Sequence, residues 1–175
     1  MQASMHSREP VAAAALVAAA GAATILGAYF FQYVLKLPPC PLCLEQRIAY
    51  YVSIPLAAVL AFAAAKHAPR QLVAAGLVVI ALAMLFNAGL ALFHAGVEWK
   101  WWPGPRECSG PINDLGSGGD LLSQLKEVSV VRCDEAAWRF LGLSLAGYNV
   151  LISYALAVIA AWGDAMAWRA DERKA

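Results

Sequence analysis

The sequence predicts an all-α membrane protein, a four-transmembrane-helix bundle with two loops of unequal length on one side. Three observations lead to this fold class. Of the 175 residues, 61% are hydrophobic and only 14% are charged, whereas a soluble domain is nearer half apolar and a quarter charged. The apolar residues form four long runs, and every run lacks Asp, Glu, Lys and Arg. The net charge of +1 argues against the basic surface of a nucleic-acid-binding protein.

Each of the four runs is long enough to cross the hydrocarbon core of a bilayer. The runs cover about residues 11–31, 48–65, 72–93 and 140–162, within a single integral membrane domain of residues 1–175. About 20 helical residues at ~1.5 Å each span ~30 Å. The first run could also be read as a secretory signal peptide, but its length and the three later runs favour a retained helix. Pro55 lies inside the second run, and a bundled membrane helix tolerates it.

The connections between the runs differ in length and composition. The second and third runs are joined by residues 66–70, which predicts a tight antiparallel hairpin of helices. The other two connections, 36–47 and 95–139, share the opposite side and contain all the cysteines. In the longer one, residues 120–128 carry apolar side chains mostly on one face. This pattern predicts a short amphipathic helix on the membrane surface.

The distribution of basic residues indicates the orientation of the chain. Six of them lie in the two tails and the 66–70 hairpin, while seven are spread over about twice that length in the other two loops. The higher density favours both termini in the cytoplasm and both cysteine loops in the periplasm. Trp99, Trp101 and Trp102 form a cluster of the kind expected at the level of the lipid headgroups.

Cys40, Cys43, Cys108 and Cys133 are all the cysteines of the chain, and an even number on an oxidising face indicates disulfides. A Cys108–Cys133 bond would close a loop of about 25 residues and destabilise the unfolded state by roughly 3 to 4 kcal/mol, so a purely structural role is open for this pair. A Cys40–Cys43 bond closes almost no chain. The Cys-Pro-Leu-Cys segment therefore indicates redox chemistry.

Four thiolates could also hold a structural zinc ion. The second pair of cysteines lacks Cys-x-x-Cys spacing, and no histidine is tied to the set by its position, so we expect no metal site. Covalent c-type haem needs a histidine directly after the second cysteine, where this chain has Leu44.

Two further residues are candidates for the chemistry of the Cys-x-x-Cys segment. Pro41 suits the first turn of a helix that continues into the second run, which places Cys43 near a helix N-terminus, where a thiolate is favoured. Arg47 follows Cys43 by four residues, so it projects from the same face and adds a positive charge. His94 ends the third run on the cysteine side, and either an interface role or a role in the reaction fits it. Interhelical hydrogen bonds are expected for the amides of Gln32, Asn87 and Asn149.

Taken together, the chain resembles the disulfide bond formation protein B (DsbB) family over nearly its whole length. The resemblance rests on the segment Cys40-Pro41-Leu42-Cys43 with Gln46-Arg47 at the start of the second run, on the four runs, and on Cys108 and Cys133 in the long second loop. It also rests on the stretch from Cys133 to Gly142, with Trp138, Phe140 and Leu141.

The resemblance implies a bacterial inner-membrane enzyme. Such an enzyme reoxidises a periplasmic DsbA-like protein of the thioredoxin fold and passes the electrons to a membrane quinone, ubiquinone or menaquinone. It further implies that the partner forms a mixed disulfide at Cys108, that the released Cys133 attacks Cys40, and that Cys43 is freed beside the quinone. Arg47 is then expected to stabilise the thiolate and the charge that develops on the quinone, with Cys43 and His94 in the same site.

Two other functions are open on the sequence alone. A vitamin-K-epoxide-reductase-like protein also couples loop cysteines to a quinone, but its Cys-x-x-Cys would be expected after the loop cysteines, and here it comes first. A small transporter or membrane assembly factor with structural disulfides is the second. Ion-coupled transporters usually carry ionisable groups within their spans, which these four runs lack.

Overall fold

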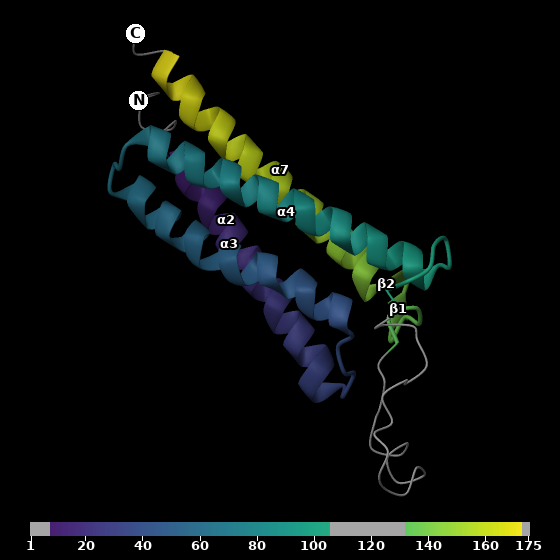
Figure 1. Cartoon of the computed structure of the whole chain (residues 1–175). Coiled ribbons are helices and arrows are strands. Elements are labelled where there is room, and N and C mark those ends of the chain that lie inside the picture. Colours follow the sequence, from purple (N-terminus) through teal and green to yellow (C-terminus); the bar gives the residue numbers. More distant parts are fainter. Residues whose placement is uncertain (1–7, 106–131, 173–175) are drawn as a thin grey trace, which may run out of the picture.

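A computed structural model describes residues 8–105 and 132–172 of the chain, with side chains up to residue 168. Long helices dominate the described part (Figure 1). Helix α2 covers Arg8–Tyr29 and continues into a π-helical turn, η1, at Phe30–Val34; α3 covers Pro41–Ala65, α4 covers Arg70–Glu98 and α7 covers Leu145–Glu172. Strands β1 (Arg139–Phe140) and β2 (Leu143–Ser144) pair antiparallel in a small hairpin.

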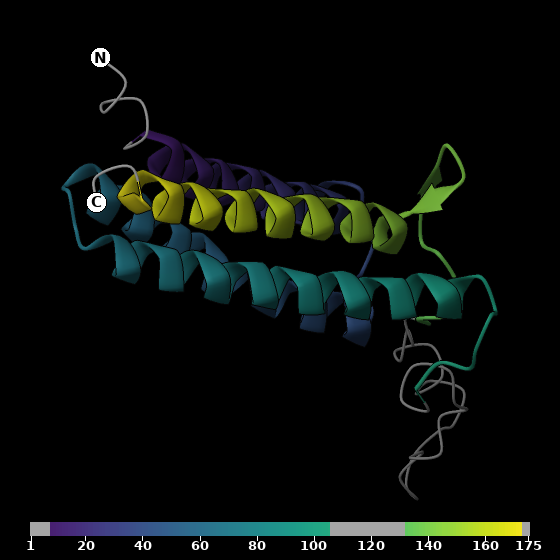
Figure 2. The same cartoon turned by 90° about the horizontal axis from the view of Figure 1, so that it is seen from above.

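The helices form an antiparallel bundle. The start of α2, the end of α7 and the turn between α3 and α4 lie at one end of the bundle, and the β hairpin lies at the other (Figures 1 and 2). Helix α7 packs most extensively against α4, and α2 against α3. Four segments are long and apolar enough to cross a membrane: Arg8–Val34, Pro41–Ala65, Arg70–Glu98 and Leu145–Trp168. The predicted fold class, a four-transmembrane-helix bundle, is confirmed.

The outer surface of the bundle is apolar, as a lipid-facing surface must be. Phe86 is 76% exposed, and Phe62 and Leu26 are each 67% exposed. Soluble monomers rarely expose apolar surface on this scale. Inside the bundle, small residues let the helices approach: a Cβ added at Gly163 of α7 would lie 2.5 Å from the Cβ of Ala13 in α2. Close backbone approach of this kind is typical of membrane helix contacts.

Several helix ends differ from the predicted runs, because a helix does not end where its apolar side chains end. Helix α3 begins at Pro41, so the last seven residues of the predicted 36–47 loop are helical. Helix α4 continues five residues past the predicted run and ends at Glu98. The predicted 140–162 span is wrong at its start. Leu141 and Gly142 have φ of 49° and 85° and form a two-residue turn between β1 and β2, so α7 begins only at Leu145.

The connection between α3 and α4 is the tight hairpin that the sequence predicts. His67 has φ of 60°, and the N–H of Ala68 donates to the carbonyl of Ala63 at 2.9 Å, which ends α3. Helix α3 runs through Pro55 without interruption. The predicted amphipathic helix at 120–128 lies outside the described residues.

Candidate functional site

The Cys-x-x-Cys segment opens α3, as the sequence predicts. Cys40 is the N-cap residue, with φ of −74° and ψ of 165°, and Pro41 takes the first helical position. The Sγ of Cys40 accepts a hydrogen bond from the backbone N–H of Cys43 at 3.2 Å, so it caps the helix. The two sulfurs lie 2.7 Å apart and are not bonded. They therefore face each other, as a dithiol that closes to a disulfide requires.

The two thiols differ in their surroundings. Cys40 is buried, with 4% of its surface exposed, while Cys43 is partly exposed. Its hydrogen bond with Cys43 raises the pKa of Cys40 above the usual range of a thiol, and burial raises it further. Cys40 therefore keeps its proton in the reduced pair. The negative charge falls to Cys43, which lies at the positive end of the α3 dipole.

Cys133 is fully buried beside this pair. It packs in one cluster with Cys40 and Leu42. The next residue, Asp134, fastens the segment to the end of α4, because its carboxylate accepts hydrogen bonds from Arg132 Nη2 at 2.9 Å and from Lys100 Nζ at 2.6 Å. These two cations hold the pKa of Asp134 well below its usual range. The fourth predicted cysteine, Cys108, lies outside the described residues.

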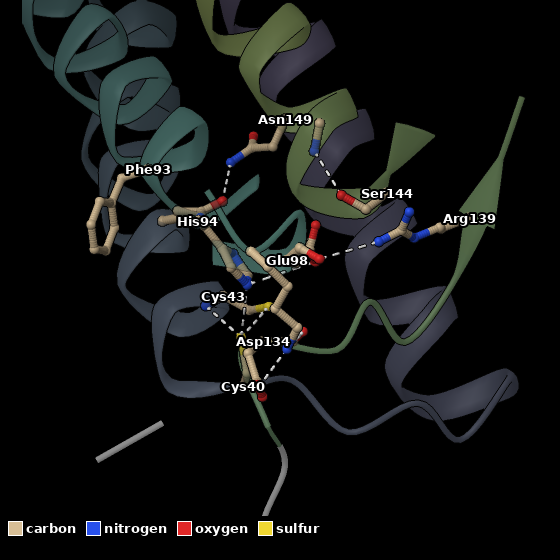
Figure 3. A network of polar contacts seen from close by, with 12 residues as sticks. Cys40, Cys43, Phe93, His94, Glu98, Asp134, Arg139, Ser144 and Asn149 are labelled. Atoms are coloured by element: carbon tan, nitrogen blue, oxygen red, sulfur yellow. Dashed lines mark hydrogen bonds and ion pairs between the residues drawn. The ribbon is translucent and has the colours of Figure 1, made fainter. Parts of the chain in front are cut away.

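His94 of α4 lies next to the cysteine pair, and its ring lies between the two sulfurs and the side chain of Asn149 (Figure 3). Its Nε2 atom is 3.6 Å from Cys40 Sγ, and only 2% of the residue is exposed. Its Nδ1 atom is 3.0 Å from the amide nitrogen of Gln46. His94 is therefore buried against the cysteine pair, and its role in the reaction stays a prediction.

Hydrogen bonds on three helices fix which ring nitrogen of His94 carries the proton. Tyr50 donates to Asn149 Oδ1 at 2.6 Å, so the amide nitrogen of Asn149 faces Gln46 and donates to its Oε1 at 2.6 Å. The amide nitrogen of Gln46 is thereby turned toward His94 and donates to Nδ1. In a neutral imidazole whose Nδ1 accepts, the hydrogen is on Nε2. His94 therefore presents an N–H group to Cys40.

Glu98 occupies the next turn of α4 and was not among the predicted site residues. Its Oε1 lies 3.8 Å from His94 Nε2, and its Oε2 is buried without a hydrogen-bond partner. Ser144 hydrogen-bonds its carboxyl group, and Arg139 donates to its main-chain carbonyl at 3.4 Å. The spacing of four residues from His94 is the signal that could have identified it.

Arg47 projects from α3 on the side of Cys43, as predicted. Its Nη1 donates to Gln32 Oε1 at 2.7 Å, and its guanidinium lies over the ring of Tyr29, 5.5 Å from the centroid. Gln32 thus bonds between helices, as expected for the three amides. Asn87 does the same by donating to Ser153 at 2.9 Å. The contacts hold the Arg47 charge in one place.

A cavity of about 910 Å³ opens beside these groups, within the size range of ordinary ligand pockets. Its polar side is lined by Cys40, Cys43, Gln46, Arg47, His94 and Glu98. Apolar residues of α2 and α7, such as Ala23, Gly27, Ala28 and Ile152, line the other side. The arrangement suits a ligand with a compact polar head and a long apolar body, held with its head against a thiol and a fixed positive charge.

Three possible metal ligands lie together in the structure: the ligand atoms of Cys40, Cys43 and His94 are within 4.8 Å of one another. The sequence alone did not show that a histidine lies near the cysteines. Two thiolates on one tetrahedral zinc ion, each ~2.3 Å from the metal, are about 3.8 Å apart. The two sulfurs here are 2.7 Å apart. The sulfurs are close enough to close to a disulfide, and the absence of a metal site stays a prediction.

Comparisons with known proteins agree with this chemistry. Residues 10–163 match the family described as "Disulfide bond formation protein DsbB". The chain is 31% identical over 147 residues to a protein of Azoarcus sp. (strain BH72) named "Disulfide bond formation protein B", covering 81% of this chain and 84% of that one. It is 31% identical over 154 residues to a protein of the same name from Hahella chejuensis, covering 81% and 82%.

A third protein of that name, from Polaromonas sp., is 28% identical over 156 residues, covering 83% of this chain and 84% of the relative. No solved structure gives a significant match. The matched residues extend over nearly the whole membrane bundle. The chain therefore belongs to the DsbB family of disulfide bond formation proteins, and it is a multi-pass bacterial inner-membrane protein.

Proposed function

We propose that this chain reoxidises a periplasmic DsbA-like dithiol protein of the thioredoxin fold and passes the electrons to a membrane quinone, either ubiquinone or menaquinone. One observation carries the proposal: the dithiol of Cys40 and Cys43 and the Arg47 guanidinium line the same cavity, which also has extensive apolar walls from the membrane helices α2 and α7. A thiol oxidase that discharged its electrons to a water-soluble acceptor would have no need of such walls.

On the thiol side, the proposed order of exchange is the one that membership of the family implies. A thiolate of the partner attacks the Cys108–Cys133 bond and forms a mixed disulfide at Cys108, and the released Cys133 attacks Cys40. Cys43 then leaves as the thiolate. The packing of Cys133 against Cys40 supports the second exchange, since the attacking and attacked sulfurs belong to one buried cluster.

On the acceptor side, Arg47, Cys43 and His94 are the residues that would hold the quinone head. A bound quinone supplies a two-electron acceptor that diffuses within the bilayer. A DsbA-like partner is itself a strong oxidant, with a potential of about −120 mV, so its reoxidation needs a continual drain of electrons. Arg47 stabilises the Cys43 thiolate and negative charge that develops nearby, in a site from which the apolar walls exclude water.

The same proposal sets the orientation. The start of α2, the end of α7 and the turn between α3 and α4 lie at one end of the bundle, and the start of α3, which carries Cys40 and Cys43, lies at the other (Figures 1 and 2). We place the first end in the cytoplasm and the second in the periplasm, where thiol chemistry is oxidising. Residues 1–175 then form one integral membrane domain.

The test is anaerobic mixing of the purified protein with a short-chain ubiquinone and a reduced DsbA-like protein, followed by the ultraviolet absorbance of the quinone. We expect stoichiometric quinone reduction, and none with the Cys40→Ser, Cys43→Ser double variant. Absence of quinone reduction by the unmodified protein would refute the proposal. Disulfide formation in cells that persists in the double variant would instead favour a transporter or an assembly factor with structural disulfides.

A further inference from the structure

We propose that Glu98 takes up a proton when the Cys40–Cys43 disulfide is reduced and gives it up when the disulfide re-forms, so that one negative charge alternates between Glu98 and Cys43. The uptake depends only on the dithiol. The release to an acceptor rests on the proposed function, because it is the quinone that needs the proton.

The position of Glu98 is unfavourable for a residue with a purely structural role. Its side chain is buried, with 8% of the residue exposed, and Oε2 has no hydrogen-bond partner. It is also the last residue of α4, where the negative end of the helix dipole repels a carboxylate. Buried charges are ordinarily paired and hydrogen-bonded. A buried carboxyl group with a free oxygen on a cavity wall is instead equipped to exchange a proton.

A short series of contacts links Glu98 to the dithiol (Figure 3). Glu98 Oε1 lies 3.8 Å from His94 Nε2, which lies 3.6 Å from Cys40 Sγ, which in turn lies 2.7 Å from Cys43 Sγ. The hydrogen on Nε2 therefore has three acceptors around it: the Cys40 sulfur, the Glu98 carboxylate and the main-chain carbonyl of Cys133. A negative charge on the cysteine pair therefore disfavours a negative charge on Glu98, and the reverse, because only the His94 imidazole separates them in a largely buried site.

The positive charges around Glu98 can stabilise one anion in either position. The Arg139 guanidinium bonds the main chain of Glu98, and the Arg47 guanidinium faces the cavity from α3 beside Cys43. His94 presents a neutral N–H donor, and the Cys40 thiol keeps its proton. When the disulfide is closed, the charge resides on Glu98; when it is open, Cys43 is the anion and Glu98 is neutral.

The reaction balances with Glu98 as the second proton donor. The Cys40 thiol, the Cys43 thiolate, protonated Glu98 and a quinone give the disulfide, the quinol and the Glu98 carboxylate. The sulfurs lose two electrons and the quinone gains them. Of the two protons on the quinol, one comes from Cys40 and one from Glu98, and a single negative charge is present on each side. Reduction of the disulfide by a dithiol reverses the exchange, and one of the two protons of the reductant goes to Glu98.

The first experiment needs no quinone. The quinone-free protein in detergent is reduced with dithiothreitol, and an infrared difference spectrum is recorded between the reduced and oxidised states. We expect a protonated-carboxyl band to appear on reduction in the unmodified protein and to be missing in Glu98→Gln. The matched control is Glu45→Gln, an exposed glutamate near the start of α3, which should leave the band in place. An identical band in Glu98→Gln, or no band in the unmodified protein, would overturn the proposal.

The second experiment measures the release of the proton. Prereduced protein is mixed anaerobically with a short-chain ubiquinone in a single turnover. Loss of a positioned proton donor typically slows a step by about 100- to 10,000-fold. We therefore expect Glu98→Gln to slow quinone reduction by a factor in this range, and Glu98→Asp, which keeps the carboxyl group, to recover part of the rate. The first thiol exchange of both variants, between a reduced DsbA-like protein and the loop cysteines Cys108 and Cys133, involves no proton on Glu98 and should match the unmodified protein, which a general disruption of the fold would not allow.

The two proposals fail in different ways. If the unmodified protein shows the carboxyl band but does not reduce quinone, the proposed function is wrong and the proton uptake by Glu98 stands. If quinone reduction proceeds at the same rate in Glu98→Gln and in the unmodified protein, the release of the proton from Glu98 is refuted and the proposed function stands. If Glu98→Gln does not accumulate in cells, Glu98→Asp replaces it in the infrared experiment. A shift in the frequency of the protonated-carboxyl band would assign the band to residue 98, and an unshifted band would refute the assignment.

Discussion

Replacing Arg47 with alanine tests how the site stabilises negative charge. Arg47 lies four residues after Cys43 on one helix, which puts the two Cβ atoms about 5–6 Å apart, and we take this as the approximate separation of the two charges. At an effective dielectric constant of about 20, two unit charges ~5.5 Å apart interact by about 3 kcal/mol. Removal of the guanidinium should therefore slow the quinone-dependent step roughly 100- to 200-fold.

The assay is steady-state quinone reduction with a reduced DsbA-like protein, in which the two substrates are varied separately. We expect Arg47→Ala to lower the rate at every quinone concentration, while thiol exchange between the partner and the loop cysteines stays within about twofold, because the attacked disulfide lies in another loop. Arg47→Lys should recover only part of the rate, since a point charge cannot both donate to Gln32 and stack on Tyr29 as the planar guanidinium does.

A Gln32→Leu variant provides the matched control. It removes the hydrogen-bond partner of Arg47 but leaves the guanidinium charge on the same helix face as Cys43, so its quinone-dependent rate should fall less than that of Arg47→Ala. If Arg47→Ala leaves the quinone dependence unchanged, Arg47 is only an anchor at the membrane interface and the electrostatic argument is wrong.

Three further predictions concern the thiols, the topology and the packing. Cys133→Ser should accumulate a mixed disulfide between Cys108 and the partner, visible as a band of summed mass on a non-reducing gel; an equal band in Cys108→Ser would show that the wrong sulfur was assigned. In intact cells, a membrane-impermeant thiol reagent should label the reduced native cysteines but not a cysteine placed at His67, and the reverse pattern would invert the topology. Gly163→Ala should lower thermal stability in detergent by about 1 to 3 kcal/mol, because the added methyl group would lie 2.5 Å from the first membrane helix, whereas Gly89→Ala, with nothing within 4 Å, should cause no loss.

The membrane bundle could be predicted because lipid imposes one simple requirement on the sequence. Helices that face hydrocarbon need long runs without charge, and such runs can be read without knowledge of their neighbours. The start of α3 is also predictable, because its signal lies in adjacent residues: Pro41 suits the first helical position, and this places Cys43 within the first turn. The hairpin at Leu141 and Gly142 was missed because its residues are apolar and so merged with the run that follows.

Contacts between distant segments could not be predicted in the same way. His94 follows Cys40 by 54 residues, and nothing in either segment specifies that α4 packs where His94 Nε2 meets the Cys40 sulfur. Glu98 could not be predicted for a related reason, because it lies beyond the end of the third apolar run. Helix α4 instead carries Glu98 into the bundle, where the pairing with His94 follows from helical spacing.

The polar network in the core of the bundle is better explained by the site than by stability. Interhelical hydrogen bonds between membrane helices contribute on average only about 0.6 kcal/mol each, and an apolar core of the same volume would pack as well. These hydrogen bonds set the orientation of each side chain in turn. The bond from Tyr50 orients the Asn149 amide, and the bond from Asn149 orients the Gln46 amide, which then donates to His94 Nδ1. Three residues on two helices thereby keep a hydrogen on Nε2, the one atom of the ring that faces both the Cys40 sulfur and the Glu98 carboxyl group.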